Sequence, residues 1–155
     1  MYVRLIFAMV NFAARKGLAV ESQGNDSAKV RARRTGVRGE TYAYWYLRRQ
    51  GYTLIARNFT LPGVHGEIDI VGYDGPVLAF VEVKTRSATG AGQPSAEDAV
   101  NIYKRRNLAR MAQQFIRVRR LEPAAYRFDI LAIETRAGAK PCIRLHRNAF
   151  AIETH

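Results

Sequence analysis

Two acidic residues and one lysine occupy positions from which they could bind a metal ion and act on a phosphodiester bond. Asp69 lies in a segment that predicts one strand, and the tripeptide Glu82-Val83-Lys84 ends the segment that predicts the next. Residues two apart on a strand share a face, so Glu82 and Lys84 point the same way. Carboxylates are ligands for Mg²⁺, and a nearby lysine can stabilise charge on a reacting phosphate. These residue types therefore indicate metal-dependent phosphoryl chemistry.

The pairing of the two strands decides how close the carboxylates come. Residues 74–76 (Asp-Gly-Pro) predict a turn, so the strands should form a hairpin. If the hairpin closes across Asp74 and Gly75, Glu82 is a diagonal neighbour of Asp69 on the same face, and a shift of two places them directly opposite. Glu67 shares the face of Asp69. Both registers stay open, and both bring the acids and Lys84 together.

The strand that carries Glu82 reads Val77-Leu78-Ala79-Phe80-Val81, which predicts a central strand buried on both faces. A buried carboxylate is costly unless it is paired or bound to a cation. A structural ion pair with Lys84 is the alternative interpretation. It explains two charges, but it does not easily explain three or four acids that meet one lysine. Magnesium, for which manganese can substitute, is the cofactor we expect.

Glu40 is a candidate fourth acid. Residues Thr35 to Gln50 predict a helix on which Val37, Glu40, Tyr44 and Leu47 fall at spacings of three and four, and so share one face. A glutamate on this face either reaches the acidic cluster or benefits from the helix dipole near the N-terminus. Periodicity alone does not separate the two readings.

The remaining elements predict an α/β fold with a mixed four- or five-stranded sheet flanked by helices. Apolar alternation and turn signals place strands at Tyr52 to Phe59, Glu67 to Tyr73, Val77 to Lys84 and Tyr126 to Glu134, with a short edge strand at Ile143 to Leu145. A long helix runs from about Ser95 to Arg120, and its apolar stripe is Val100, Tyr103, Leu108, Met111, Phe115 and Val118.

The charge balance favours a polyanionic partner. The 155 residues include 25 Lys and Arg against 13 Asp and Glu, a net charge of +12. Lysine and arginine that neutralise phosphates release counterions, so nucleic acid, and DNA first, is the partner we expect; an anionic membrane surface ranks lower. The length fits one domain.

Residues 1–30 predict an N-terminal extension and residues 31–155 the folded domain. The apolar run at residues 5–10 is too short to span a bilayer, which takes about 20 residues, so no stable membrane insertion is expected. Cys142 is the one cysteine and excludes an internal disulfide. That composition fits a cytoplasmic protein. Near the last strand, Cys142 predicts a small buried thiol.

Several blocks of sequence, in one order and spacing, resemble a known family: Arg38-Gly39-Glu40, Gly51-Tyr52, Arg57-Asn58, Gly66-Glu67-Ile68-Asp69-Ile70, Phe80-Val81-Glu82-Val83-Lys84-Thr85-Arg86 and Arg127-Phe128-Asp129. They resemble the UPF0102, or YraN, family, which is similar to archaeal Holliday-junction resolvases and to the PD-(D/E)xK nuclease superfamily. The resemblance covers roughly residues 35 to 135. It implies a restriction-endonuclease-like core. Ile68 stands where the superfamily has a proline.

The resemblance also implies roles for individual residues. Asp69 and Glu82 are then the metal ligands, joined by the Val83 carbonyl. Lys84 is the catalytic lysine, and Glu40 completes the site from the helix. The implied function is a magnesium-dependent endonuclease that hydrolyses DNA phosphodiester bonds, including those of branched DNA. The alternatives are a nucleic-acid-binding module of nuclease fold with little or no catalysis, and a scaffold for a protein partner.

Substrate contacts are predicted from charges beside this site. Arg38, Arg86 and Lys104 are the candidates for binding a nucleic-acid backbone. Aromatic residues at positions 42, 44, 45 and 46 favour the core and its rim over base stacking. Asp129 favours a buried structural role, and Glu67 has no assigned role. Resolvase-like relatives act as dimers, so a homodimer is a candidate state.

Overall fold

A computed structural model describes residues 6, 9, 28–87, 102–135 and 140–151 of the chain. Two long helices and five strands follow one another in these ranges. In chain order they are α2 (Ala28–Arg49), β1 (Thr53–Leu61), β2 (Val64–Asp74), β3 (Val77–Ser87), α3 (Ile102–Val118), β4 (Ala125–Thr135) and β5 (Cys142–Phe150).

The five strands form one sheet in the order β1-β2-β3-β4-β5. The pairs β1–β2, β2–β3 and β4–β5 are antiparallel, whereas β3 and β4 run parallel. A parallel pair needs a crossover connection, and α3 lies in the segment that joins β3 to β4. The predicted mixed α/β sheet with flanking helices is therefore confirmed, and it is consistent with a restriction-endonuclease-like core. β3 is central, as its apolar sequence predicts.

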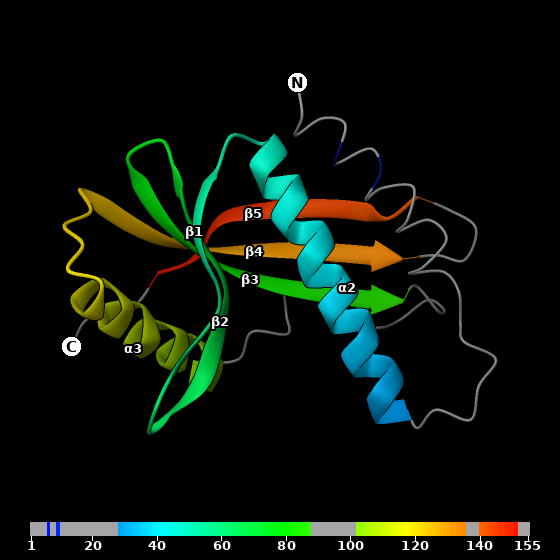
Figure 1. Cartoon of the computed structure of the whole chain (residues 1–155), viewed down its shortest axis with the longest axis horizontal. Coiled ribbons are helices and arrows are strands. Elements are labelled where there is room, and N and C mark those ends of the chain that lie inside the picture. Colours follow the sequence, from blue (N-terminus) through cyan, green and yellow to red (C-terminus); the bar gives the residue numbers. More distant parts are fainter. Residues whose placement is uncertain (1–5, 7–8, 10–27, 88–101, 136–139, 152–155) are drawn as a thin grey trace.

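The core consists of two layers on opposite faces of the sheet. Neighbouring residues of β3 go to different layers: Phe80 packs with Met111 and Phe115 of α3, whereas Val81 packs with Leu47 of α2. Successive side chains of a strand point to opposite faces, so each helix covers one face. Figure 1 shows α2 running diagonally across β3 and β4, and α3 lying near β2.

The buried face of α2 differs from the predicted one. Leu47 is buried as expected, but Glu40 and Tyr44 are only half-buried, and the fully buried positions include Gly39, Tyr42 and Ala43. The reason is close packing. A Cβ on Gly39 would overlap the Thr85 hydroxyl of β3, so the helix turns its small residues toward the sheet. The four aromatic residues of α2 contribute to the core and its rim, as predicted.

The apolar stripe of α3 is confirmed at its centre and wrong at its ends. Leu108, Met111 and Phe115 are buried, but Tyr103 is 74% exposed and Val118 55% exposed. The exposed residues lie at the two ends of α3 (Ile102–Val118), so periodicity alone overestimated the buried length. Val100 lies outside the described residues.

The last strand is longer than predicted, and Cys142 is exposed rather than buried. β5 is the edge strand beside β4, and its side chains at 142 and 144 face solvent while 143 and 145 are half-buried. The proposed division at residue 30 falls within α2, near its start at Ala28; the separate character of residues 1–30 stays a prediction. Among the described residues, no helix combines the length and the apolar character that a membrane span requires.

Candidate metal centre

The pairing of β2 with β3 brings Asp69 and Glu82 to the same level of the sheet. Ile70 pairs with Val81, and the same register carried one residue further sets Asp69 against Glu82. Regular pairing ends there, because Oδ2 of Asp69 accepts a hydrogen bond from the backbone N–H of Val83 at 2.7 Å. That bond fixes the orientation of the Asp69 carboxylate.

This is the second of the two registers left open by the sequence. Asp74 pairs with Val77, so the loop holds Gly75 and Pro76 rather than Asp74 and Gly75. Proline has no N–H to donate to a strand partner, and Gly75 supplies a left-handed conformation with φ 59°. Loop length fixes hairpin register, which explains why the acids lie opposite and not diagonal.

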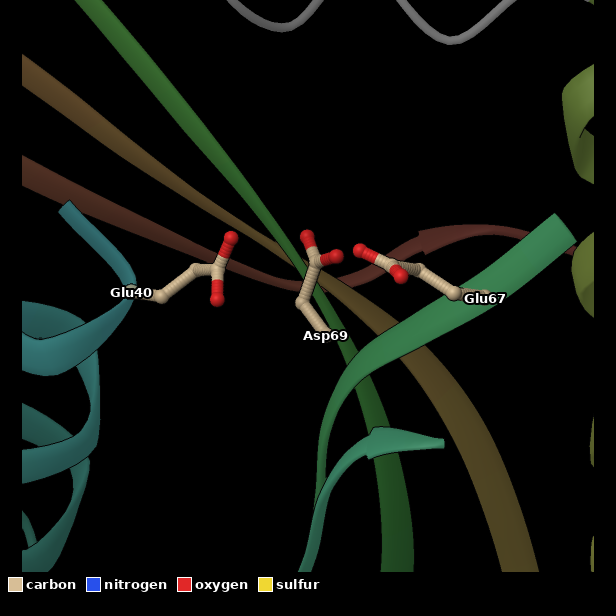
Figure 2. Close-up of side chains that lie close together, drawn as sticks. All are labelled: Glu40, Glu67 and Asp69. Atoms are coloured by element: carbon tan, nitrogen blue, oxygen red, sulfur yellow. The ribbon is translucent and has the colours of Figure 1, made fainter. Parts of the chain in front are cut away.

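Three carboxylates from two elements converge beside this point. Glu40 of α2, Glu67 of β2 and Asp69 of β2 each offer an oxygen atom, and these atoms lie within 4.8 Å of one another. Figure 2 shows the Asp69 carboxylate between the other two, with Glu40 reaching from the helix on one side and Glu67 from the strand on the other. Like charges so close repel one another. The cluster is therefore an arrangement that a cation would stabilise.

An asparagine that sequence reasoning missed positions Glu40. The side-chain amide of Asn58 donates to Oε2 of Glu40 at 2.8 Å. Asn58 itself has a φ of 47° within β1, a left-handed conformation that asparagine tolerates better than most residues. Its place in the Arg57-Asn58 block was the one available signal, and nothing there indicated which acid it contacts.

Glu82 is the most deeply buried acid of the site, at 3% exposure. Its Oε1 atom accepts from Nζ of Lys84 at 2.6 Å and also pairs with Nζ of Lys104. Its Oε2 atom is buried too, and among the described residues no group donates a hydrogen bond to it. An unsatisfied buried carboxylate oxygen costs free energy unless a further ligand reaches it. One half of the Glu82 carboxylate is thus neutralised, and the other half is not.

The electrostatics of Asp69 agree with this geometry. Its pKa is raised to about 7: burial is the largest cause and the charge of Glu82 adds to it, while the Val83 amide and Lys104 oppose the shift. A cation favours the ionised form of a carboxylate. A bound divalent ion would therefore lower the pKa of Asp69 and keep its carboxylate ionised.

Lys104 takes part in the site more directly than expected. Sequence analysis assigned it to a nucleic-acid backbone, yet α3 brings its ammonium group onto Glu82. Burial disfavours its charged form, but the hydrogen bond to Glu82 and the charge of that residue raise the pKa of Lys104 overall. The site therefore contains two lysines, one from β3 and one from the crossover helix.

The other two residues predicted to contact a nucleic-acid backbone, Arg86 and Arg38, have no demonstrated role. Arg86 is half-buried on β3, two residues beyond Lys84. Arg38 belongs to α2, but its side chain is outside the described part of the chain. The Val83 carbonyl stays a prediction as a ligand, since the contact seen is that of its amide.

Asp129 is fully buried and lies in a separate network on the other face of the sheet. Its Oδ1 accepts from Nε of Arg127 at 2.9 Å and from the backbone N–H of Asn148 at 2.9 Å. Its Oδ2 accepts from the Tyr52 hydroxyl at 3.1 Å. These contacts agree with the structural role predicted for it.

Comparison with known proteins places the chain among relatives of undetermined activity. The model described as "Uncharacterised protein family UPF0102" matches residues 39–133, a range that includes Glu40, Asp69, Glu82 and Lys84. A UPF0102 protein of Solibacter usitatus is 48% identical over 113 residues, covering 72% of this chain and 82% of that relative. UPF0102 proteins of Koribacter versatilis and Symbiobacterium thermophilum are each 41% identical over 119 residues. Each match covers 77% of this chain; it covers 80% of the Koribacter protein and 98% of the Symbiobacterium protein.

Proposed function

We propose that this chain, which belongs to the UPF0102 family, is a metal-dependent endonuclease that hydrolyses DNA phosphodiester bonds. The observation that carries the proposal is the unsatisfied Oε2 atom of Glu82 beside three converging carboxylates. Buried polar atoms are usually hydrogen-bonded, so a buried oxygen without a donor among the described residues indicates a further ligand. The resemblance to resolvase-like nucleases and the net charge of +12 support a nucleic-acid substrate. Branched DNA is the first candidate.

The residues present fit a magnesium ion. Mg²⁺ prefers oxygen ligands and is usually held by one or two carboxylates together with water and phosphate oxygens. Asp69 and Glu82 would hold it, with Glu40 completing the site from α2 and Glu67 within reach as the third carboxylate of the cluster; the same oxygens suit Mn²⁺. When bound, the ion supplies positive charge that stabilises the reacting phosphate and acidifies water.

The chain's own groups position and balance this centre. The Val83 amide orients Asp69, and Asn58 holds Glu40. Lys104 offsets the charge of Glu82 from the side of α3. Lys84 is 21% exposed and lies next to Glu82, so its ammonium group can contact a phosphate and stabilise the charge that grows there.

Cleavage assays with purified protein test the proposal. Linear, supercoiled and four-way-junction DNA are incubated with Mg²⁺ or Mn²⁺, and then with chelator. We expect metal-dependent cleavage that falls about 10²- to 10³-fold in Lys84→Ala, as when one group that stabilises developing charge is removed. Asp69→Asn should abolish it. Glu134→Gln is the matched control, because Glu134 is an acid that pairs with Arg144 at the surface.

Three outcomes are distinguishable. Absence of metal-dependent cleavage on every substrate, or equal cleavage by Lys84→Ala and the wild type, would overturn the proposal. Salt-sensitive DNA binding without cleavage would favour a binding module of nuclease fold. Loss of both would favour a scaffold for a protein partner.

A further inference from the structure

A cavity of about 400 Å³ opens between α3 and the acidic end of β2. Glu67 and Asp69 line one end of it, and Lys104 lies on the α3 side. Its volume falls within the range of small-molecule sites, about 300–1,000 Å³. The cavity is therefore continuous with the proposed metal centre and large enough for one small planar group.

The rest of its lining is unlike a metal site. Tyr103, 74% exposed, stands at its edge, Asn107 adds a side-chain amide, and the buried Leu108 and Met111 supply an apolar surface. An aromatic ring can stack on any nucleobase, whatever the sequence of the nucleic acid. An amide both donates and accepts hydrogen bonds. An aromatic face, an amide and an apolar floor together match a heteroaromatic ring with polar edges.

We infer that this cavity is a subsite for one unpaired nucleobase, held next to the phosphate that Lys104 and a metal ion at the acidic end would receive. The inference rests on the proposed function for its nucleic-acid ligand, and adds a substrate feature to it. A base within a duplex is stacked on both faces and must leave the stack to enter a pocket. The preferred substrate thus carries a nucleotide without a partner beside the cleaved bond.

The exposure of Tyr103 supports this assignment. Its position in the apolar stripe of α3 predicted burial, yet the ring is largely exposed and lines the cavity. Ile102, its neighbour, is 60% exposed but does not line the cavity. The two residues form a matched pair on one helix turn: both are large and exposed, and one of them faces the cavity.

The test is DNA binding in chelator, where metal-dependent cleavage cannot occur. Fluorescence anisotropy compares two duplexes of equal length, one fully paired and one with a single-nucleotide bulge. We expect the wild type to bind the bulged duplex more tightly. Tyr103→Ala should lose about 5- to 100-fold affinity for the bulged duplex, the range for one base–aromatic stack, and keep its affinity for the paired one. Tyr103→Phe and Ile102→Ala should behave as the wild type.

Other results would overturn the inference. Equal loss on both duplexes would make Tyr103 a general backbone contact, and unchanged affinity for the bulge would leave the cavity without this ligand. Circular dichroism of each variant checks folding, and Asn107→Ala provides a second variant from the same wall. Selective binding without any cleavage would defeat the nuclease proposal alone, whereas cleavage without selectivity would defeat the subsite alone.

Discussion

Glu82 and Asp129 are buried carboxylates on neighbouring central strands, yet their surroundings differ completely. Val81 pairs with Asp129 and Glu82 with Ile130, so the two acids are one residue apart in register and point to opposite faces of the sheet. Asp129 is 0% exposed and Glu82 is 3% exposed. Burial alone therefore does not distinguish them.

Their partners do. Asp129 uses both oxygens: Arg127 binds each of them, and Tyr52 and the Asn148 amide supply further donors. The hydrogen bond with Asp129 contributes most to raising the pKa of Arg127. Glu82 instead meets two lysines at one oxygen, and no group among the residues that the structure describes donates to the other.

The difference teaches how a fold separates structural acids from chemical ones. The guanidinium group of arginine is planar and presents a fixed fork of donors, whereas lysine is a point charge on a flexible stem. The Asp129 network is complete and holds three strands and a tyrosine in place. In the described part of the chain the Glu82 carboxylate has donors at one oxygen only, as expected if the proposed metal ion is its further partner.

The largest expected effect is a loss of stability when the Asp129 network is broken. Arg127→Ala leaves Asp129 charged and buried without its main partner, so we expect the free energy of unfolding to fall by about 3–5 kcal/mol. Urea unfolding at neutral pH measures it. Arg144→Ala is the control, because Arg144 pairs with Glu134 at the surface, where a pair contributes about 0–1 kcal/mol. A loss below about 1 kcal/mol for Arg127→Ala would remove the contrast between the two acids.

The second effect separates the sites by their response to metal. Mg²⁺ at 100 times its dissociation constant should stabilise the wild type by about 2.7 kcal/mol, measured as a rise in thermal unfolding temperature. Glu82→Gln should abolish that rise while the protein stays folded. Asp129→Asn should lower the unfolding temperature without metal but keep the rise. A rise that survives in Glu82→Gln would show that the ion binds elsewhere.

The third effect concerns the approach of α2 to the site. Gly39→Ala places a methyl group against Thr85, and overpacking of this kind costs about 1–3 kcal/mol. Because Glu40 follows Gly39, metal-dependent stabilisation should weaken as well. Thr85→Ala in the same chain removes the hydroxyl and should restore part of both losses. The Cβ of residue 85 remains, and it would lie 3.0 Å from the new methyl carbon, so full recovery is not expected.

The smallest effect is a pH dependence in the complete network. A hydrogen bond from Arg127 is the main cause that lowers the pKa of Asp74. A lowered acid pKa stabilises the fold above its unfolded value of about 3.9, and this contribution is lost as pH falls through the folded value. The difference in unfolding free energy between the wild type and Asp74→Asn, up to about 1 kcal/mol at pH 7 for such a partly exposed pair, should therefore shrink toward pH 3. For Asp69, whose pKa is raised, the contribution to stability changes with pH in the opposite direction. A difference that grows on acidification would contradict this assignment.

The sequence predicted the elements and the local part of the site well. Strand alternation and a short turn were enough to bring Asp69, Glu82 and Lys84 together, because these residues belong to one hairpin. The family resemblance added Glu40, which periodicity alone left undecided. The register was narrowed to two choices, and the missing N–H of Pro76 could have selected the correct one.

The rest depends on tertiary packing that no local pattern records. The contact of Asn58 with Glu40 joins a strand to a helix, and that of Lys104 with Glu82 joins the crossover helix to the sheet. Gly39 rotates the buried face of α2 because of a side chain 46 positions away in sequence, Thr85. Such contacts become visible only once the elements are placed.

The parallel pairing of β3 with β4 also has a consequence for folding kinetics. Asp69 of β2 and Glu82 of β3 lie within one hairpin, and contacts between near neighbours in sequence form quickly. Lys104 arrives on the helix of the crossover, whose closure must bring distant segments together. The pairing that sets Asp69 against Glu82 is thus local, whereas Lys104, like Glu40 of α2, joins the centre through contacts between elements that are distant in sequence. Appearance of the Glu82–Lys104 contact would therefore report the late, topology-limited step of folding.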